Sequence, residues 1–490
     1  MIVLLLILIP LLGGLVSFFL KEERTSRSWA LLVAFASLAV SIFGLTVAKS
    51  PDQLAFSASW LGSLGSRFSI ALDGLSQVLC LLTAIAYPLI FIATWNTSYK
   101  KANNFFGLML LTQAGLIGVF TATDALLFYF FWELALVPVY FICSAWGGER
   151  RIAVTFKFFI YTFTASVLML IGLLYLYFQT PDRSFSIESF YALNLPVTTQ
   201  SWLFWLMFVA FAVKMPMFPF HTWQPDTYEQ SPTAATMVLS GLMVKMGVYA
   251  VIRWVWPIFP EGVHMWGDVV MSLSVAGVLY ASVIAIQQND LKRLIAYSSI
   301  AHIGIMIMSI FAENKIGMQG VMMQMFNHGI NIIGLWIVVE LIERQFHTRK
   351  LSELGGIAQK APGLTILLVI VAFANISLPL TNAFVGEFLM FNGIWNTASN
   401  YRIVFAVLAG LSIILAAVYT LNMIQKVFFG NANELTEKAH DIKINERLAL
   451  GIIVVLIFVF GVYPQPMLNL TNGFVDALLK EVNVANLLVK

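Results

Sequence analysis

The sequence predicts an all-α polytopic membrane protein with about fourteen transmembrane helices. Of its 490 residues, 59% are hydrophobic and only 11% are charged, against about 45–50% and about 25% in soluble domains. The apolar residues also gather into runs of about 20, the length that crosses a bilayer as a helix. Since backbone amides in hydrocarbon must be bonded within their own segment, and no alternating barrel pattern occurs, these runs are expected to be helices.

The first run, residues 1–20, ends at the charged residues 21–24. It has neither a basic leading region nor a small-residue cleavage site, so it is expected to be a retained helix and not a signal peptide. Thirteen further runs follow, near residues 29–47, 75–95, 104–121, 125–145, 153–178, 202–222, 232–256, 266–287, 293–311, 317–342, 364–395, 402–428 and 447–466. The tail from 463 to 490 is expected to be an interfacial helix or a partner contact.

The positive charges predict the orientation of these helices. Of the 28 lysines and arginines, 17 lie in one alternate set of connections and eight lie on the opposite side. The positive-inside rule places the richer side in the cytoplasm, so both termini are expected outside, in the periplasm of a bacterium. The net charge of +3 gives no reason to expect a nucleic-acid partner.

Redox and metal chemistry have little support in the sequence. The two cysteines, Cys80 and Cys143, fall short of the four thiolates that hold an iron–sulfur cluster. No dinucleotide fingerprint or haem motif occurs, and no metal site is predicted. Electron transfer is therefore not expected in this chain.

Four charged residues lie deep within apolar runs: Lys214, Lys245, Glu133 and Glu387. Each costs about 2.5–3.5 kcal/mol at the bilayer centre, and intramembrane ionisable groups usually mark an ion or proton path. The alternatives are an ion pair that pins two helices together or a lysine that reaches the surface. Four such charges on four separate spans favour the path. Lys157 lies near a helix end, where reaching the surface is cheap, and is expected to do so.

Two histidines, His302 and His328, lie in successive spans. A neutral imidazole accepts a proton at one nitrogen and donates at the other near neutral pH, so both are candidate relay groups between Lys245 and the far side of the membrane. The alternative, a buried histidine bonded to a backbone carbonyl, stays open. His264, His347 and His440 fall in loops and indicate no function.

Two spans contain helix breakers. Pro216, Pro219 and Pro225 interrupt the span that carries Lys214, and a second break is expected at residues 376–382, before Glu387. Each proline removes an amide donor and clashes with the preceding turn. Paired interrupted helices in two halves of a chain often indicate a transport site. For the second break, a simple proline kink remains an alternative.

Four stretches resemble the antiporter-like subunits of respiratory complex I and of the multisubunit cation/proton antiporters. They are residues 132–151, 214–254, 289–304 and 385–391. The resemblance implies two inverted five-helix repeats in which helices seven and twelve are discontinuous. It also implies a division into flanking helices (1–103), a first repeat with the entry half-channel (104–256), a second with the exit half-channel (266–428) and a last helix with its tail (447–490).

Within this family, glutamate at position 387 resembles the M-type subunit, because other members generally carry lysine there. The resemblance implies that Glu133 and Lys214 gate entry, Lys245 is central and Glu387 is the exit residue. His302 and His328 are then the linking relay positions. Two departures are Gln224, where leucine is common, and residues 380–383, which replace a glycine-containing stretch.

The resemblance implies a proton-pumping membrane-arm subunit of NADH:quinone oxidoreductase. Flavin, iron–sulfur clusters and quinone are then expected in partner subunits, and no cofactor in this chain. The expected partners are lipid and other membrane-arm subunits, including adjacent antiporter-like ones. Two rival hypotheses are a subunit of a multisubunit Na⁺(K⁺)/H⁺ antiporter and a structural scaffold that does not pump.

Overall fold

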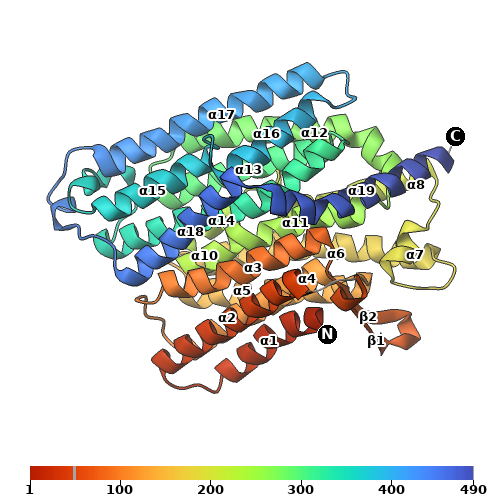
Figure 1. Cartoon of the computed structure of the whole chain (residues 1–490), viewed down its shortest axis with the longest axis horizontal. Coiled ribbons are helices and arrows are strands. Elements are labelled where there is room, and N and C mark those ends of the chain that lie inside the picture. The colour runs from red at the N-terminus through yellow and green to blue at the C-terminus, as the bar shows by residue number, and fades with distance from the viewer. Residues whose placement is uncertain (48–50, 489–490) are drawn as a thin grey trace.

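Long helices lying side by side form most of the chain (Figure 1). The computed structural model describes residues 1–47 and 51–488. The first half contains α1 (Ile2–Ser17), α2 (Glu23–Val47), β1 (Ala55–Leu61), β2 (Ser66–Ala71), α3 (Gly74–Ala93), α4 (Ala102–Thr121), α5 (Ala125–Trp146), α6 (Arg151–Gln179), α7 (Ile187–Tyr191), α8 (Val197–Lys214) and α9 (Trp223–Gln230). The second half contains α10 (Thr233–Val238), α11 (Val244–Ala250), α12 (Pro260–Gln287), α13 (Leu291–Ile310), α14 (Lys315–Phe346), α15 (Pro362–Asn375), α16 (Asn382–Trp395), α17 (Arg402–Ile424), α18 (Ile444–Val462) and α19 (Gln465–Leu488).

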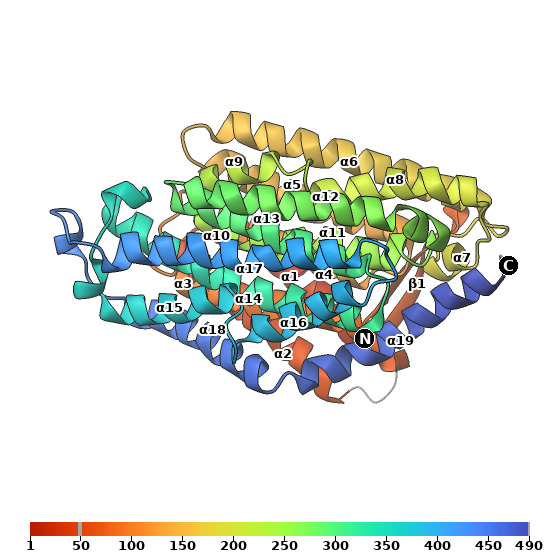
Figure 2. The same cartoon turned by 90° about the horizontal axis from the view of Figure 1, so that it is seen from above.

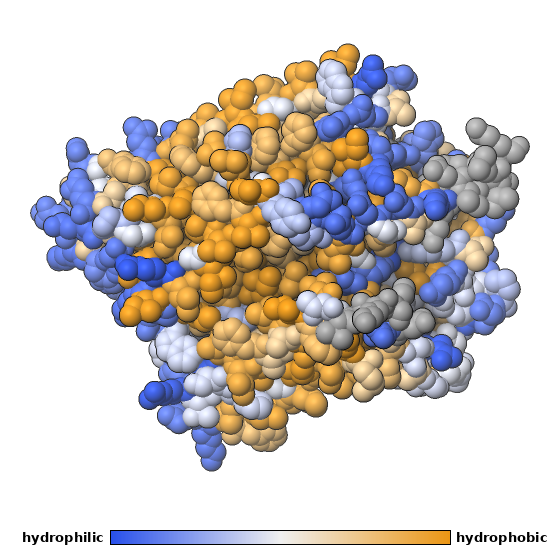
Figure 3. Space-filling model, in the orientation of Figure 1, coloured by the Kyte–Doolittle hydropathy of each residue, from blue (hydrophilic) through white to orange (hydrophobic). Residues whose placement is uncertain are grey.

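The prediction of a polytopic helical membrane protein is confirmed. Among the described residues, twelve helices are long and apolar enough to cross a membrane, and α1 and α15 are shorter apolar helices. Hydrophobic residues cover much of the middle of the molecule, and hydrophilic residues gather at the two ends of the helices (Figure 3). This belt is what a bilayer requires of a protein that crosses it.

Both predicted breaks are present. Helix α8 ends at Lys214 and α9 begins at Trp223, so the span with three prolines is discontinuous. Helix α15 ends at Asn375 and α16 begins at Asn382. In the second break Ser377 and Leu380 adopt positive φ angles of 57° and 75°, a region that side-chain-bearing residues seldom occupy. A simple kink does not describe either break, because a non-helical segment separates the two helices in each.

The helix that carries Lys245 lies at the centre of the bundle. Residues Thr233–Val255 form one span that is entirely buried within the protein. Two π-helical turns, Leu239–Met243 and Val251–Val255, flank the short α11 that bears the lysine. Single π-helical turns inside α-helices are frequent at functional sites. The helix α14, which is also buried, packs beside this span and carries His328.

The chain also contains a short hairpin and a helical tail. β1 and β2 form an antiparallel hairpin before α3, which departs from the all-helical prediction. The tail is a helix, α19, and Figure 2 shows it along the outside of the bundle. It packs against α3 and α14 through its buried residues, so part of the tail is covered by the chain itself.

Glycines bring α14 and α16 close together. A Cβ built on Gly393 would lie 2.4 Å from the Cα of Gly317, a backbone atom that cannot rotate away. We expect Gly393→Ala to push the two helices apart and to lower the stability of the protein by about 1–3 kcal/mol, the usual cost of overpacking. Thermal unfolding of the purified protein measures this. The matched control is Gly451→Ala, since a Cβ on Gly451 meets nothing within 4 Å; equal melting temperatures for the two variants would contradict the prediction.

Candidate proton path

Lys245 and His328 contact each other in the core. The Lys245 Nζ atom lies 2.8 Å from His328 Nδ1 and donates a second hydrogen bond to the carbonyl oxygen of Ser240, also at 2.8 Å. The lysine is completely buried and the histidine nearly so. Since α10 continues into α11 through a π-helical turn, the Ser240 carbonyl is available to a side chain five residues further on.

The series of polar side chains continues from His328 through His302 to Glu387. The rings of His328 and His302 have centroids 5.4 Å apart, and His302 Nδ1 lies 3.1 Å from Glu387 Oε1. The Gln324 amide donates to the same carboxylate oxygen at 3.3 Å. His302 and Glu387 are each 5% exposed. Four residues predicted from the sequence therefore lie in one buried row, on α11, α14, α13 and α16.

Lys214 and Glu133 stand apart from this row. Lys214 Nζ is buried without a hydrogen-bond partner, and Glu133 Oε1 has none either. The amine lies 5.4 Å from the centre of the Trp132 ring and within Coulombic range of Glu133. The two lysine-bearing helices α8 and α11 lie close together at Gly247. A Cβ at this position would lie only 2.7 Å from the Phe211 carbonyl oxygen. No contact between described residues joins Lys214 directly to Lys245.

The first break is held by Lys157. Its amine donates to the carbonyl oxygen of Thr222 at 2.9 Å and to Asp226 Oδ2 at 2.8 Å. Arg293 donates to the other oxygen of Asp226 at 3.0 Å. The side chain of Lys157 is about a third exposed, as predicted for a lysine that reaches the surface, and it also bonds the two groups named above. These contacts with Thr222 and Asp226 could not be predicted from the position of Lys157 alone.

Gln224, one of the two departures from the family pattern, is fully buried in α9. Its amide contacts the hydroxyl of Tyr228 one turn later, which is also fully buried. These buried polar groups lie directly beyond the break that follows Lys214.

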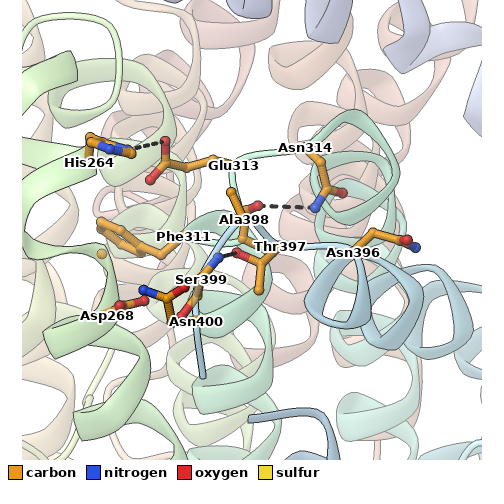
Figure 4. A pocket seen from close by; sticks show the side chains of 12 residues that line it. His264, Asp268, Phe311, Glu313, Asn314, Asn396, Thr397, Ala398, Ser399 and Asn400 are labelled. Atoms are coloured by element: carbon orange, nitrogen blue, oxygen red, sulfur yellow. Dashed lines mark hydrogen bonds and ion pairs between the residues drawn. The ribbon is translucent and has the colours of Figure 1, made fainter. Parts of the chain in front are cut away.

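A polar cavity of about 390 Å³ opens where α12 begins and where the α13–α14 and α16–α17 connections meet. Figure 4 shows the side chains of His264 and Glu313 pointing toward each other at one side of this cavity, and His264 Nδ1 lies 3.5 Å from Glu313 Oε2. The sequence indicates no role for His264, because a lone histidine in a loop does not point to a function. The structure places it in this cavity, at the end of α13 opposite to Leu291.

Burial raises the pKa of the Glu313 carboxyl, and Asp268 adds to the rise, whereas His264 opposes it. A carboxyl whose pKa is higher in the folded state binds more protons there, so folding stability falls as pH rises from the ordinary glutamate range through the raised value. We expect Glu313→Gln to be more stable than the parent above that interval and equal to it below. Thermal unfolding over a pH series measures this. Glu149→Gln, an exposed site, is the control; identical pH profiles for Glu313→Gln and the parent would contradict the prediction.

The described residues contain no group of three or more histidine, cysteine or acidic side chains able to hold a metal ion. Cys80 and Cys143 are both buried and free, on α3 and α5. The row from Lys245 to Glu387 consists of amine, imidazole and carboxylate groups, which exchange protons.

The chain is similar to known membrane proteins in both sequence and fold. The model of the family described as NADH:quinone oxidoreductase/Mrp antiporter, transmembrane, matches residues 122–423. NADH-quinone oxidoreductase subunit M of Rickettsia prowazekii (strain Madrid E) is 35% identical over 485 residues, which cover 96% of this chain and 97% of the relative. A chain of respiratory complex I from Thermus thermophilus superposes with a TM-score of 0.91 at 28% identity, over 98% of this chain and all of that one.

A chain of the Mrp complex from Dietzia sp. DQ12-45-1b shares the fold, with a TM-score of 0.86. It is only 18% identical, and this chain covers 56% of its length, so the likeness extends to the fold alone. The relative from Rickettsia matches from end to end at nearly twice that identity. The chain therefore belongs to the NADH:quinone oxidoreductase/Mrp antiporter family of transmembrane subunits.

Proposed function

We propose that this chain is the M-type, proton-translocating subunit of the membrane arm of an NADH:quinone oxidoreductase. The observation that carries the proposal is the buried row from Lys245 through His328 and His302 to Glu387. Each ionisable side chain buried inside a membrane protein opposes folding. Four of them are therefore expected only where they have a function. A neutral imidazole that accepts at one nitrogen and donates at the other is suited to pass protons between an amine and a carboxylate.

In this proposal Glu133 and Lys214 form the entry gate, and Lys245 receives the proton behind it. The two histidines relay it to Glu387, the exit residue. The division into flanking helices (1–103), two inverted five-helix repeats (104–256 and 266–428) and a terminal region (447–490) places one break in each repeat. The cavity lined by His264 and Glu313 lies on the side proposed as the exit.

The energy of an ion pair between Glu133 and Lys214 is similar in size to the work of moving a proton across the membrane. An ion pair about 5 Å apart is worth about 3.3 kcal/mol at an effective dielectric constant of about 20. Moving one proton against 100 mV costs about 2.3 kcal/mol. Separating Glu133 from Lys214 therefore changes the energy of the lysine's proton by an amount comparable to the work of pumping. Lys214 Nζ has no hydrogen-bond partner among the described residues and lies within Coulombic range of Glu133, so the charge of this carboxylate is able to control the energy of the lysine's proton.

Amine, imidazole and carboxylate groups exchange protons but do not supply the energy that drives them across the membrane. We propose that partner subunits carry the flavin, the iron–sulfur clusters and the quinone site, and that adjacent antiporter-like subunits and lipid contact this chain. The inner membrane of a bacterium, with both termini in the periplasm, is the proposed location. In Figure 1 the start of α1 and the end of α19 lie toward the same end of the bundle as the β1–β2 hairpin.

Extraction of the chain from its host in mild detergent tests this assignment. We expect flavin and iron–sulfur subunits to accompany it and NADH-driven proton uptake in liposomes to be independent of sodium. Companions that lack redox groups, together with sodium-dependent flux, would favour the antiporter rival, with which the family model and the shared fold are compatible. The glutamate at position 387 favours the oxidoreductase.

A further inference from the structure

A second set of polar groups reaches Glu387 from a direction that the row does not use. The hydroxyl oxygens of Tyr419 on α17 and Ser298 on α13 lie 3.0 Å apart, and either one can be the donor. The amide of Asn375, the last residue of α15, donates to Ser298 Oγ at 3.3 Å. All three side chains are buried, at 4% exposure or less. A pair of hydroxyls that can reverse its polarity is able to carry a proton in either direction.

A small cavity lies between Tyr419 and Glu387. It has a volume of about 10 Å³ and is lined by both of these residues, by His302 and by Ser412. About 10–15 Å³ holds one water molecule when two to four polar groups can bond it. Glu387 Oε1 already accepts from His302 and Gln324, and among the described contacts Oε2 accepts none. One water in this cavity therefore has a carboxylate on one side and a phenol on the other.

The hydroxyl pair lies on the side of Glu387 away from the polar cavity at His264. Ser298 precedes His302 by one turn of α13, in the direction of Leu291. Tyr419 lies about two turns beyond Ser412, in the direction of the last residue of α17. These ends of α13 and α17 adjoin the positively charged connections, which the charge distribution assigns to the cytoplasm.

We propose that Tyr419 and Ser298 form a proton branch that joins Glu387, through one buried water, to the second break at Asn375. Glu387 then exchanges protons with the polar groups of this break without passing Lys245. A proton that arrives at Ser298 moves the hydroxyl proton on to Tyr419, whose own proton passes to the water and from there to the Glu387 carboxylate. Each O–H bond that breaks is replaced by one that forms, and no side chain keeps a net charge.

This inference rests on the proposed function, and its test separates the two. The assembled complex is moved from H₂O to D₂O, and exchange at Glu387 is followed through its infrared carboxyl band, assigned by its loss in Glu387→Gln. In a Lys245→Met variant we expect exchange to continue, because the branch bypasses the lysine. Adding Tyr419→Phe should slow that exchange by about tenfold or more, since the ring stays and only the hydroxyl is lost.

Tyr401→Phe in the same Lys245→Met background is the matched control, since Tyr401 is exposed at the start of the same helix. Ser298→Ala should reproduce the effect of Tyr419→Phe, and the two together should cost no more than either alone, as groups in one chain do. Electron transfer to an artificial acceptor verifies assembly of each variant. The branch is refuted if exchange stops in Lys245→Met alone or if Tyr419→Phe leaves it unchanged. Proton pumping by the parent complex and its loss in Lys214→Ala test the proposed function separately.

Discussion

Replacing Lys214 with alanine is expected to abolish most proton pumping while electron transfer to an artificial acceptor continues. The lysine ends α8 at the first break, where its amine is buried and has no hydrogen-bond partner. Without it, no group behind Glu133 can take up the incoming proton. Glu133→Ala should have a similar effect, because the partner that controls the energy of the lysine's proton is gone.

The measurement is the number of protons taken up per two electrons by the whole complex in liposomes, alongside its rate of electron transfer. Lys100→Ala is the control, because this lysine is exposed at the turn before α4 and serves no buried path. An unchanged proton stoichiometry in both the Lys214 and the Glu133 variant would refute the assigned entry gate. A loss of electron transfer as well would indicate failed assembly.

Replacing Lys245 with methionine is expected to reduce pumping by about tenfold or more, a rise of about 1.4 kcal/mol in the barrier. Methionine keeps the length of the side chain but cannot donate to His328 Nδ1 or to the Ser240 carbonyl. Since burying an amine is costly, an apolar side chain of similar shape should leave stability unchanged or raise it. Loss of function without loss of stability is the pattern that distinguishes a relay from a structural contact.

Proton uptake and thermal unfolding, measured on the same preparation, separate these possibilities. A scaffold that does not pump predicts that Lys245→Met is silent in both. A purely structural lysine predicts a lower melting temperature together with lost activity. His328→Gln is a useful companion variant, because it preserves a polar contact to the lysine but removes the titrating ring.

The sequence was sufficient to predict the spans, the two breaks and the row of ionisable residues. Charges and prolines within apolar runs carry that information, since each is costly in lipid and is seldom present without a reason. Lys245 and Glu387 are predicted on this ground, and His302 and His328 on the ability of an imidazole to relay protons. The structure brings all four together. The separation of Lys214 from this row could not be predicted, because it depends on how α8 packs beside α11.

Other contacts lay outside what the sequence can show. Gln324, Ser298 and Tyr419 are uncharged, and such residues in spans often bond only their own helix, as Thr83 does with the Leu79 carbonyl. Nothing in the pattern distinguishes those from a serine or tyrosine that reaches a neighbouring helix. For Lys157 the position near a helix end predicted exposure to the surface, but the contacts with Thr222 and Asp226 could not be predicted.

One polar path is proposed to join Lys214 to Glu387 inside the protein. Between Lys214 and Lys245, no side-chain contact among the described residues spans the distance. A density map of the assembled complex that resolves ordered water tests this link most directly. We predict water molecules that bridge the two amines and remain separate from bulk solvent. A dry, apolar stretch between them, or amines open to bulk water, would contradict the account.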